Sequence, residues 1–112
     1  MACRVIHAAR VEVPIEPIAP AQVQEGRPRS GVVTVPAVDG LAAGIWEHTA
    51  GVSTDVETDE LFVVLTGRAT IEVEGGPTLE VGPGDLGVLE AGARTRWVVH
   101  KALRKVFVCP AR

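Results

Sequence analysis

The chain has 112 residues and a formal net charge of −3, which fits a single domain and leaves no room for a second. The charge is too small, and of the wrong sign, for nucleic acid or an anionic membrane surface to be an expected partner. Apolar runs are only a few residues long, so no segment is expected to span a membrane. Arg4 and Arg10 flank a stretch that is too short and too polar for a signal-peptide core, and this predicts a cytoplasmic protein.

The first thirty residues are predicted to form an extended arm. Four prolines (Pro14, Pro17, Pro20 and Pro28) remove backbone donors and fix extended dihedral angles in this stretch. The apolar side chains between them need cover. We therefore expect residues 1–30 to pack as an arm on a barrel that residues 31–112 form.

Short β-rich runs recur about every ten residues, which is typical of an all-β sandwich or barrel. The 12 glycines and 8 prolines interrupt any helical pattern. Gly75 and Gly84 stand in turns that need a positive φ. The expected strands are 4–6, 31–35, 42–47, 60–66, 68–73, 78–81, 86–89, 95–99 and 105–108.

Two strings between residues 60 and 92 resemble the motifs of the cupin family. In ELFVVLTG, Glu60 stands seven residues before a glycine, and GPGDLGVLEAG places Gly84 and Gly92 at the spacing of the second motif. The resemblance implies a single-domain jelly-roll barrel, also described as a double-stranded β-helix, that is usually dimeric.

Two further strings make the resemblance more specific. GIWEHTAG and TRWVVHKALRKVFV are similar to segments of the cupins related to ureidoglycine aminohydrolase and to the ethanolamine-utilisation acetate kinase. With the upstream EGRP, the similarity covers about residues 25–108.

In metal-binding cupins a His-x-His pair, a glutamate and a third histidine hold the ion. By resemblance, Glu60 keeps the place of the glutamate, whereas Thr54 and Val56 fall where the pair is expected and Thr95 where the third histidine is expected. Valine cannot ligate, and a neutral hydroxyl is a poor ligand for a transition metal. We therefore expect neither a metal nor another cofactor.

Two alternatives to this assignment stay open. A longer spacer puts the histidine pair on Ser53 and Asp55. Independently of the spacer, a substitute site would bind a divalent ion with Glu60 and either His48 or Asp55. The acidic run 55–60 is either a solvated loop or a source of carboxylates at the barrel mouth. In the second case one carboxyl group would have a raised pKa and could act as a general acid or base, as Glu60 itself could.

Alternation along the strands outlines a ligand pocket, because side chains two residues apart share a face. Three aromatic residues in it would also fill the barrel as core. Glu60 would be paired there with Arg94 or Arg96, or would be kept for a ligand. The expected pocket residues are Trp46, His48, Thr54, Val56, Glu60, Phe62, Thr95 and Trp97.

The strand that carries Glu60 is apolar on its other face too, at Leu61, Val63 and Leu65. A strand that is hydrophobic on both faces is covered on both. Either the arm or a second subunit supplies the cover, which favours a homodimer.

Three functions are compatible with these features, and the sequence leaves open whether the protein is an enzyme. The preferred one is a small cupin that binds a small polar molecule without the His-based metal site. The second is a metal-dependent enzyme related to ureidoglycine aminohydrolase. The third is a structural dimer whose own side chains fill the barrel.

Overall fold

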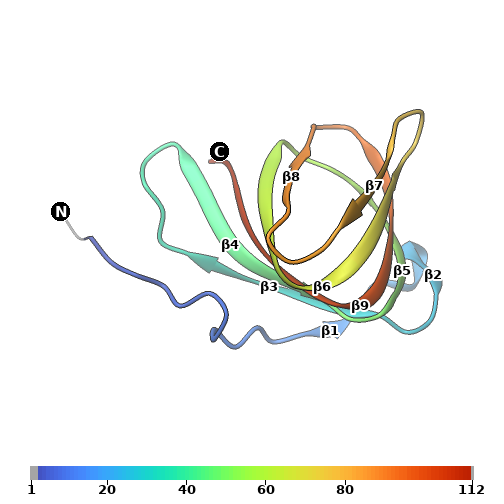
Figure 1. Ribbon diagram of the computed structural model, residues 1–112, viewed down its shortest axis with the longest axis horizontal. Helices are drawn as coiled ribbons and strands as arrows, with labels where there is room; N and C mark the ends of the chain where they lie inside the picture. The colour runs from blue at the N-terminus through green and yellow to red at the C-terminus, as the bar shows by residue number, and fades with distance from the viewer. Residues whose placement is uncertain (1–2, 112) are drawn as a thin grey trace.

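The computed structural model describes residues 3–111 and has an all-β fold (Figure 1), as predicted. Within these residues the only helical element is a single turn of 3-10 helix, η1, at Pro20–Gln22. The strands are β1 (Glu16–Pro17), β2 (Val23–Glu25), β3 (Arg29–Val35), β4 (Leu41–His48), β5 (Gly51–Val56), β6 (Glu60–Val73), β7 (Thr78–Val81), β8 (Leu86–Leu89) and β9 (Arg94–Pro110).

Two long, bent strands, β6 and β9, pair with each other along most of their length and hold the barrel together. The register between them shifts between Val64 and Ala69, where both strands turn the corner. Gly67 lies at this corner with φ +91°, and a Cβ atom there would come within 2.1 Å of the carbonyl oxygen of Ala102. Only glycine fits, because both the dihedral angle and the space exclude a side chain.

The bend creates two sheets that share β6 and β9. One runs β1-β3-β4-β9-β6-β8, and the other runs β2-β5-β9-β6-β7. Figure 1 shows how they curl towards each other into a half-open barrel. The core between them comprises Phe62, Val64, Ala69, Ile71, Val81, Leu89, Trp97, Val99 and Leu103.

The N-terminal segment runs along the outside of the first sheet. Arg104 donates a hydrogen bond to the carbonyl oxygen of Ala8 (2.7 Å), and Val13 is buried. A Cβ atom on Gly31 would lie only 1.9 Å from the carbonyl oxygen of Pro14, so the two backbones are in direct contact. Residues 1 and 2 of the predicted arm, and Arg112 at the end of the predicted barrel, lie outside the described residues.

Most predicted strands are present, but the prediction did not include β1 and β2, which lie in the arm, and it differs from the structure in three further ways. The runs 60–66 and 68–73 belong to the single strand β6, and 95–99 and 105–108 belong to β9. The strand predicted at 4–6 is wrong, because that stretch has no strand partner. β5 was not predicted, because its acidic end was interpreted as the start of a solvated loop. Among the described residues, no helix has the length and apolar character needed to cross a membrane.

Candidate functional site

A cavity of about 310 Å³ opens between the two sheets, and most titratable side chains of the barrel interior face it. Its wall combines aromatic rings with one lysine and three carboxylates. The polar, charged and aromatic residues that line it include Trp46, His48, Ser53, Thr54, Asp55, Glu57, Glu60, Trp97, Lys105 and Phe107.

The ammonium group of Lys105 is held inside the barrel by an ion pair. Its Nζ atom lies 2.6 Å from Oε2 of Glu60, and Lys105 is only 5% exposed. The same atom lies 4.7, 4.6 and 4.9 Å from the ring centroids of Trp46, Phe62 and Trp97. A charge taken out of water needs such compensation, which the carboxylate and the three ring faces supply together.

Glu57 is a buried carboxylate with fixed partners. Its Oε2 atom accepts hydrogen bonds from Oγ1 of Thr95 (2.6 Å) and from Nε1 of Trp97 (2.9 Å). Its backbone pairs with Ala93 and Gly92 at the entry to β9. These bonds hold the charge of Glu57 at the cavity wall.

Asp55 lines the cavity beside Glu57 and accepts a hydrogen bond from the backbone N–H of Val56 (2.8 Å). Burial raises the pKa of Asp55, and the neighbouring charge of Glu57 raises it further. A carboxyl group with a raised pKa in a cavity can serve as a proton donor at mildly acidic pH.

His48 is almost completely buried at the end of β4. Nδ1 lies 2.6 Å from the carbonyl oxygen of Thr49, and Nε2 lies 2.8 Å from Oγ of Ser53. Burial lowers the pKa of His48, so the ring is neutral near pH 7.

The register of β5 against β9 decides which side chains of β5 face the interior. Ser53 pairs with Trp97 and Asp55 with Thr95, and both Thr95 and Trp97 are buried. Thr54 and Val56 pair with Arg96 and Arg94. Positions 53 and 55, the pair that the longer spacer selects, therefore share a face with buried residues of β9, and Thr54 and Val56 of the opposite face also border the cavity.

Of the predicted pocket residues, six line the cavity: Trp46, His48, Thr54, Val56, Glu60 and Trp97. Phe62 and Thr95 lie behind its wall, Phe62 beneath the Lys105 ammonium and Thr95 beneath the Glu57 carboxylate. The prediction missed Lys105 and Phe107. Both lie an even number of residues after Trp97 along β9 and therefore share its face of the strand. Continuing the strand alternation beyond residue 99 would have identified them.

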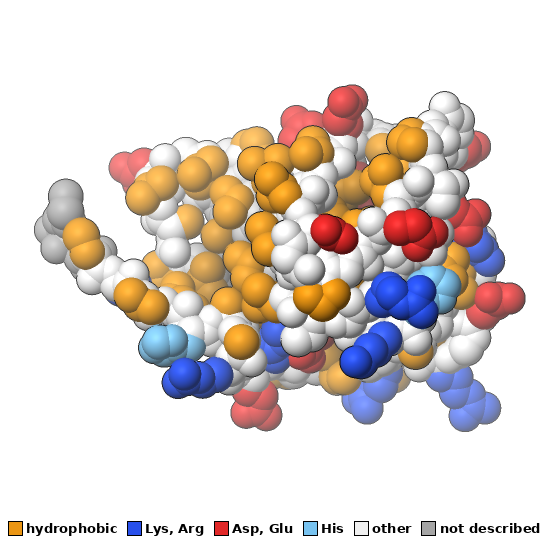
Figure 2. Space-filling view, viewed as in Figure 1, with side chains coloured by type: hydrophobic (Ala, Val, Ile, Leu, Met, Phe, Trp, Pro, Cys, Tyr) orange, Lys and Arg blue, Asp and Glu red, His pale blue; other side chains and the backbone are white. Residues whose placement is uncertain are grey.

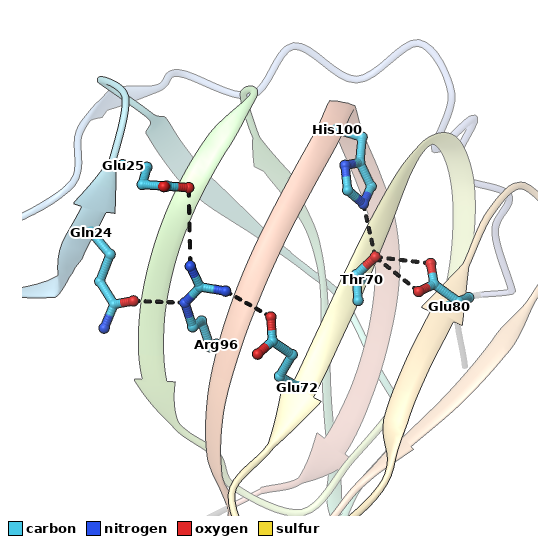
Figure 3. A network of polar contacts seen from close by, with 7 residues as sticks. All are labelled: Gln24, Glu25, Thr70, Glu72, Glu80, Arg96 and His100. Atoms are coloured by element: carbon cyan, nitrogen blue, oxygen red, sulfur yellow. Dashed lines mark hydrogen bonds and ion pairs between the residues drawn. The ribbon is translucent and has the colours of Figure 1, made fainter.

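The suggested pairing of Glu60 with Arg94 or Arg96 is wrong, because Lys105 is its partner. Arg96 lies on the outer side of the second sheet, where it bonds Gln24 (2.7 Å) and Glu72 (2.6 Å) and lies 4.0 Å from Glu25 (Figure 3).

The same figure shows the surroundings of His100, an exposed residue of β9. Nε2 of His100 lies 2.8 Å from Oγ1 of Thr70, which also bonds Glu80. A larger and more open depression of about 700 Å³ adjoins Arg96. The interior cavity, whose wall holds the buried side chains of Lys105 and His48, is the better candidate site.

Comparison with known proteins identifies the fold. The structure of the Clostridium difficile EutQ protein superposes with a TM-score of 0.70 at 16% sequence identity, over 93% of this chain and 83% of that one. A putative ethanolamine utilization protein Q from Salmonella typhimurium gives 0.62 at 20% identity, over 70% and 67%. A DUF861 protein of unknown function from Pseudomonas syringae gives 0.74 at 21% identity, over 88% of this chain and 44% of that one.

No curated protein matches the chain. The family model described as the EutQ-like cupin domain matches residues 31–107, which include strands β4 to β8, most of β3 and β9, and the Lys105–Glu60 pair with the three aromatic rings around it. The match spans more than half of the chain, and the chain therefore belongs to the family of EutQ-like cupin domains.

Proposed function

We propose that this cupin binds a small polar molecule in its barrel and does so without a histidine-bound metal. The observation that carries the proposal is the Lys105–Glu60 pair at the wall of the 310 Å³ cavity. The ammonium, three carboxylates and aromatic walls give a ligand both apolar contact and directed hydrogen bonds, which is the usual make-up of a small-molecule site.

The donor chemistry supports the metal-free part of the proposal. A transition metal needs three or four convergent donors. Among residues 3–111 no three His, Cys, Asp or Glu side chains are grouped in that way. Glu60 is occupied by an ammonium that would repel a cation, and Nε2 of His48 is bonded to Ser53. These residues therefore do not fit a transition metal.

Two measurements test this proposal. Elemental analysis of protein purified without chelator is expected to find no stoichiometric metal. A thermal-shift screen with small carboxylates, amines, ureides and sugars is expected to find compounds that stabilise the wild type and lose their effect in Lys105→Met. Exposed Lys101 on β9 provides the matched control, Lys101→Met, which should respond as the wild type does. If no compound stabilises the wild type, the binding proposal is wrong.

A metal-dependent enzyme related to ureidoglycine aminohydrolase is the second candidate. The raised pKa of Asp55 beside Glu57 favours acid–base chemistry in the cavity, which such an enzyme would also need. Stoichiometric metal in the elemental analysis, together with ammonia release from a ureido compound, would establish it in place of the first proposal.

We also propose that a second copy of the chain covers the outer face of β6 and β8. Leu61, Val63, Leu86 and Val88 are 48%, 38%, 65% and 61% exposed, and they pair across the two strands. Figure 2 shows hydrophobic side chains gathered on this face. A contiguous apolar patch favours a protein interface.

Sedimentation equilibrium tests the dimer. Leu61→Lys is expected to yield monomers, whereas Val38→Lys, which changes an exposed valine outside this patch, is expected to leave the dimer intact. A wild type that sediments as a monomer at micromolar concentration would exclude the interface.

A further inference from the structure

Ser53 and His48 form a hydrogen-bonded pair inside the cavity. A short turn joins the end of β4, which carries His48, to β5, which carries Ser53. Both side chains are buried, at 6% and 1% exposure, and both line the cavity. Neither is needed to neutralise the Lys105–Glu60 pair, so the function proposed above leaves them without a role.

The hydrogen bonds of His48 determine its tautomer. The carbonyl oxygen of Thr49, 2.6 Å from Nδ1, can only accept, so Nδ1 carries the hydrogen. In the neutral ring Nε2 then holds a lone pair, and Oγ of Ser53, at 2.8 Å, donates its hydrogen to it. A hydroxyl therefore rests on a histidine base whose other nitrogen is anchored, which is the geometry of an activated nucleophile.

The surroundings preserve this arrangement. The Trp46 ring packs against the imidazole with centroids 5.3 Å apart. Ser53 faces inward because it pairs with Trp97 in the register of β5 and β9. Burial lowers the pKa of His48, so the base is unprotonated at neutral pH.

One cation and three carboxylates face the same cavity, and the cation matters for this chemistry. The carboxylates are those of Asp55, Glu57 and Glu60. The ammonium of Lys105 is the cation that the cavity wall offers to a negatively charged oxygen. Such a group stabilises the oxyanion that forms when a hydroxyl attacks an acyl carbon.

We propose that Ser53 and His48 are a catalytic pair for acyl transfer from small esters and activated acyl compounds. The proposal rests on the function proposed above, because the substrate must enter the same cavity. The Oγ–C bond forms while the proton of the hydroxyl passes to Nε2 of His48. The bond to the leaving oxygen then breaks, and that oxygen takes the proton. Water repeats both steps on the acyl-serine and releases a carboxylic acid.

Covalent trapping with phenylmethylsulfonyl fluoride tests the pair. Oγ of Ser53 displaces fluoride from sulfur, the hydroxyl proton goes to His48, and the protein gains one sulfonyl group. Peptide mapping by mass spectrometry is expected to place the label on Ser53. Ser53→Ala should remain unlabelled, whereas Thr70→Ala, which changes a hydroxyl that lies 2.8 Å from another histidine, His100, outside the cavity, should be labelled as the wild type is.

Two kinetic measurements separate activation from simple exposure. His48→Gln is expected to slow labelling about 10²-fold, the contribution typical of a general base. Because a buried histidine can also support folding, the pH dependence of the wild type is the second measurement. The labelling rate should rise with pH and reach its plateau at a pH below 6.5, the ordinary pKa of histidine, because the pKa of His48 is lowered. The labelling rate of an unactivated hydroxyl instead continues to rise at high pH.

Several outcomes would overturn the pair: a folded wild type without label on Ser53, labelling of folded His48→Gln at the wild-type rate, or a rate that rises without a plateau. If Ser53 is unlabelled while ligands still shift the thermal midpoint, only the catalytic pair fails. If Ser53 is labelled while no ligand stabilises the fold, the binding proposal fails and the pair stands.

Discussion

Replacing Lys105 with methionine removes the ammonium while keeping the length of the side-chain stem. The Glu60 side chain, 13% exposed, then loses the ammonium group that pairs with it. Breaking a buried ion pair on one side costs about 3–5 kcal/mol, which is a large part of the 5–15 kcal/mol typical of a whole domain. We therefore expect Lys105→Met to lose about 3–5 kcal/mol of unfolding free energy.

A double variant separates loss of the pair from loss of packing. In Glu60→Leu/Lys105→Met both charges are gone, and apolar replacement of a buried pair is often neutral or stabilising. Most of the loss should therefore be recovered. Urea titration followed by tryptophan fluorescence measures this directly, because Trp46 and Trp97 both lie against the Lys105 ammonium.

Lys101→Met serves as the surface control and should stay within about 0.5 kcal/mol of the wild type. The reasoning is refuted if Lys105→Met costs less than about 1 kcal/mol, because the ammonium would then be solvated and the cluster would not hold it. It is equally refuted if the double variant is as unstable as the single one.

Three further predictions concern titration and the arm. The raised pKa of Asp55 means that its carboxyl group binds a proton more tightly in the folded state than in the unfolded state. Stability should therefore fall as pH rises from 3.8 through the folded pKa. Denaturant titrations of Asp55→Asn should not show this loss. Since the pKa of His48 is lowered, its contribution to stability should be lost as pH falls below 6.5, and NMR of the imidazole nitrogens should show the Nδ1–H tautomer and a pKa below 6.5. Gly31→Ala places a Cβ 1.9 Å from the Pro14 carbonyl oxygen, so the arm should be cleaved faster in limited proteolysis while the barrel stays resistant; an unchanged cleavage rate would show that the arm does not pack there.

Strand alternation predicted the interior well wherever the strand was recognised. Trp97, assigned to the interior by parity, is a core residue. The same parity, continued across residues 100–102, reaches Lys105 and Phe107. The prediction stopped at residue 99 because the polar, basic run there resembles the end of a strand, whereas β9 only bends and continues to Pro110.

The partner of Glu60 could not be found from local sequence. Lys105 lies 45 residues away, and its approach depends on the register of β6 against β9, in which Val64 pairs with Lys105. That register shifts at the Gly67 corner. Local patterns do not encode the size of such a shift, so an arginine of the same basic segment was an equally reasonable candidate.

The positions that face the cavity are set by strand pairing, and the residues that occupy them set the chemistry. β5 presents positions 53 and 55 inward whatever residues stand there, since these positions pair with Trp97 and Thr95. In this chain position 53 is a serine whose hydroxyl is hydrogen-bonded to His48, and position 55 is an aspartate beside Glu57. The carboxylate of Glu60 is paired with the ammonium of Lys105. These neighbouring groups can hold and transfer protons. The hydroxyl of Ser53 donates its hydrogen to the lone pair on Nε2 of His48. A metal ion bound to Nε2 would occupy that lone pair. Activation of Ser53 and metal binding at His48 are therefore mutually exclusive in this barrel.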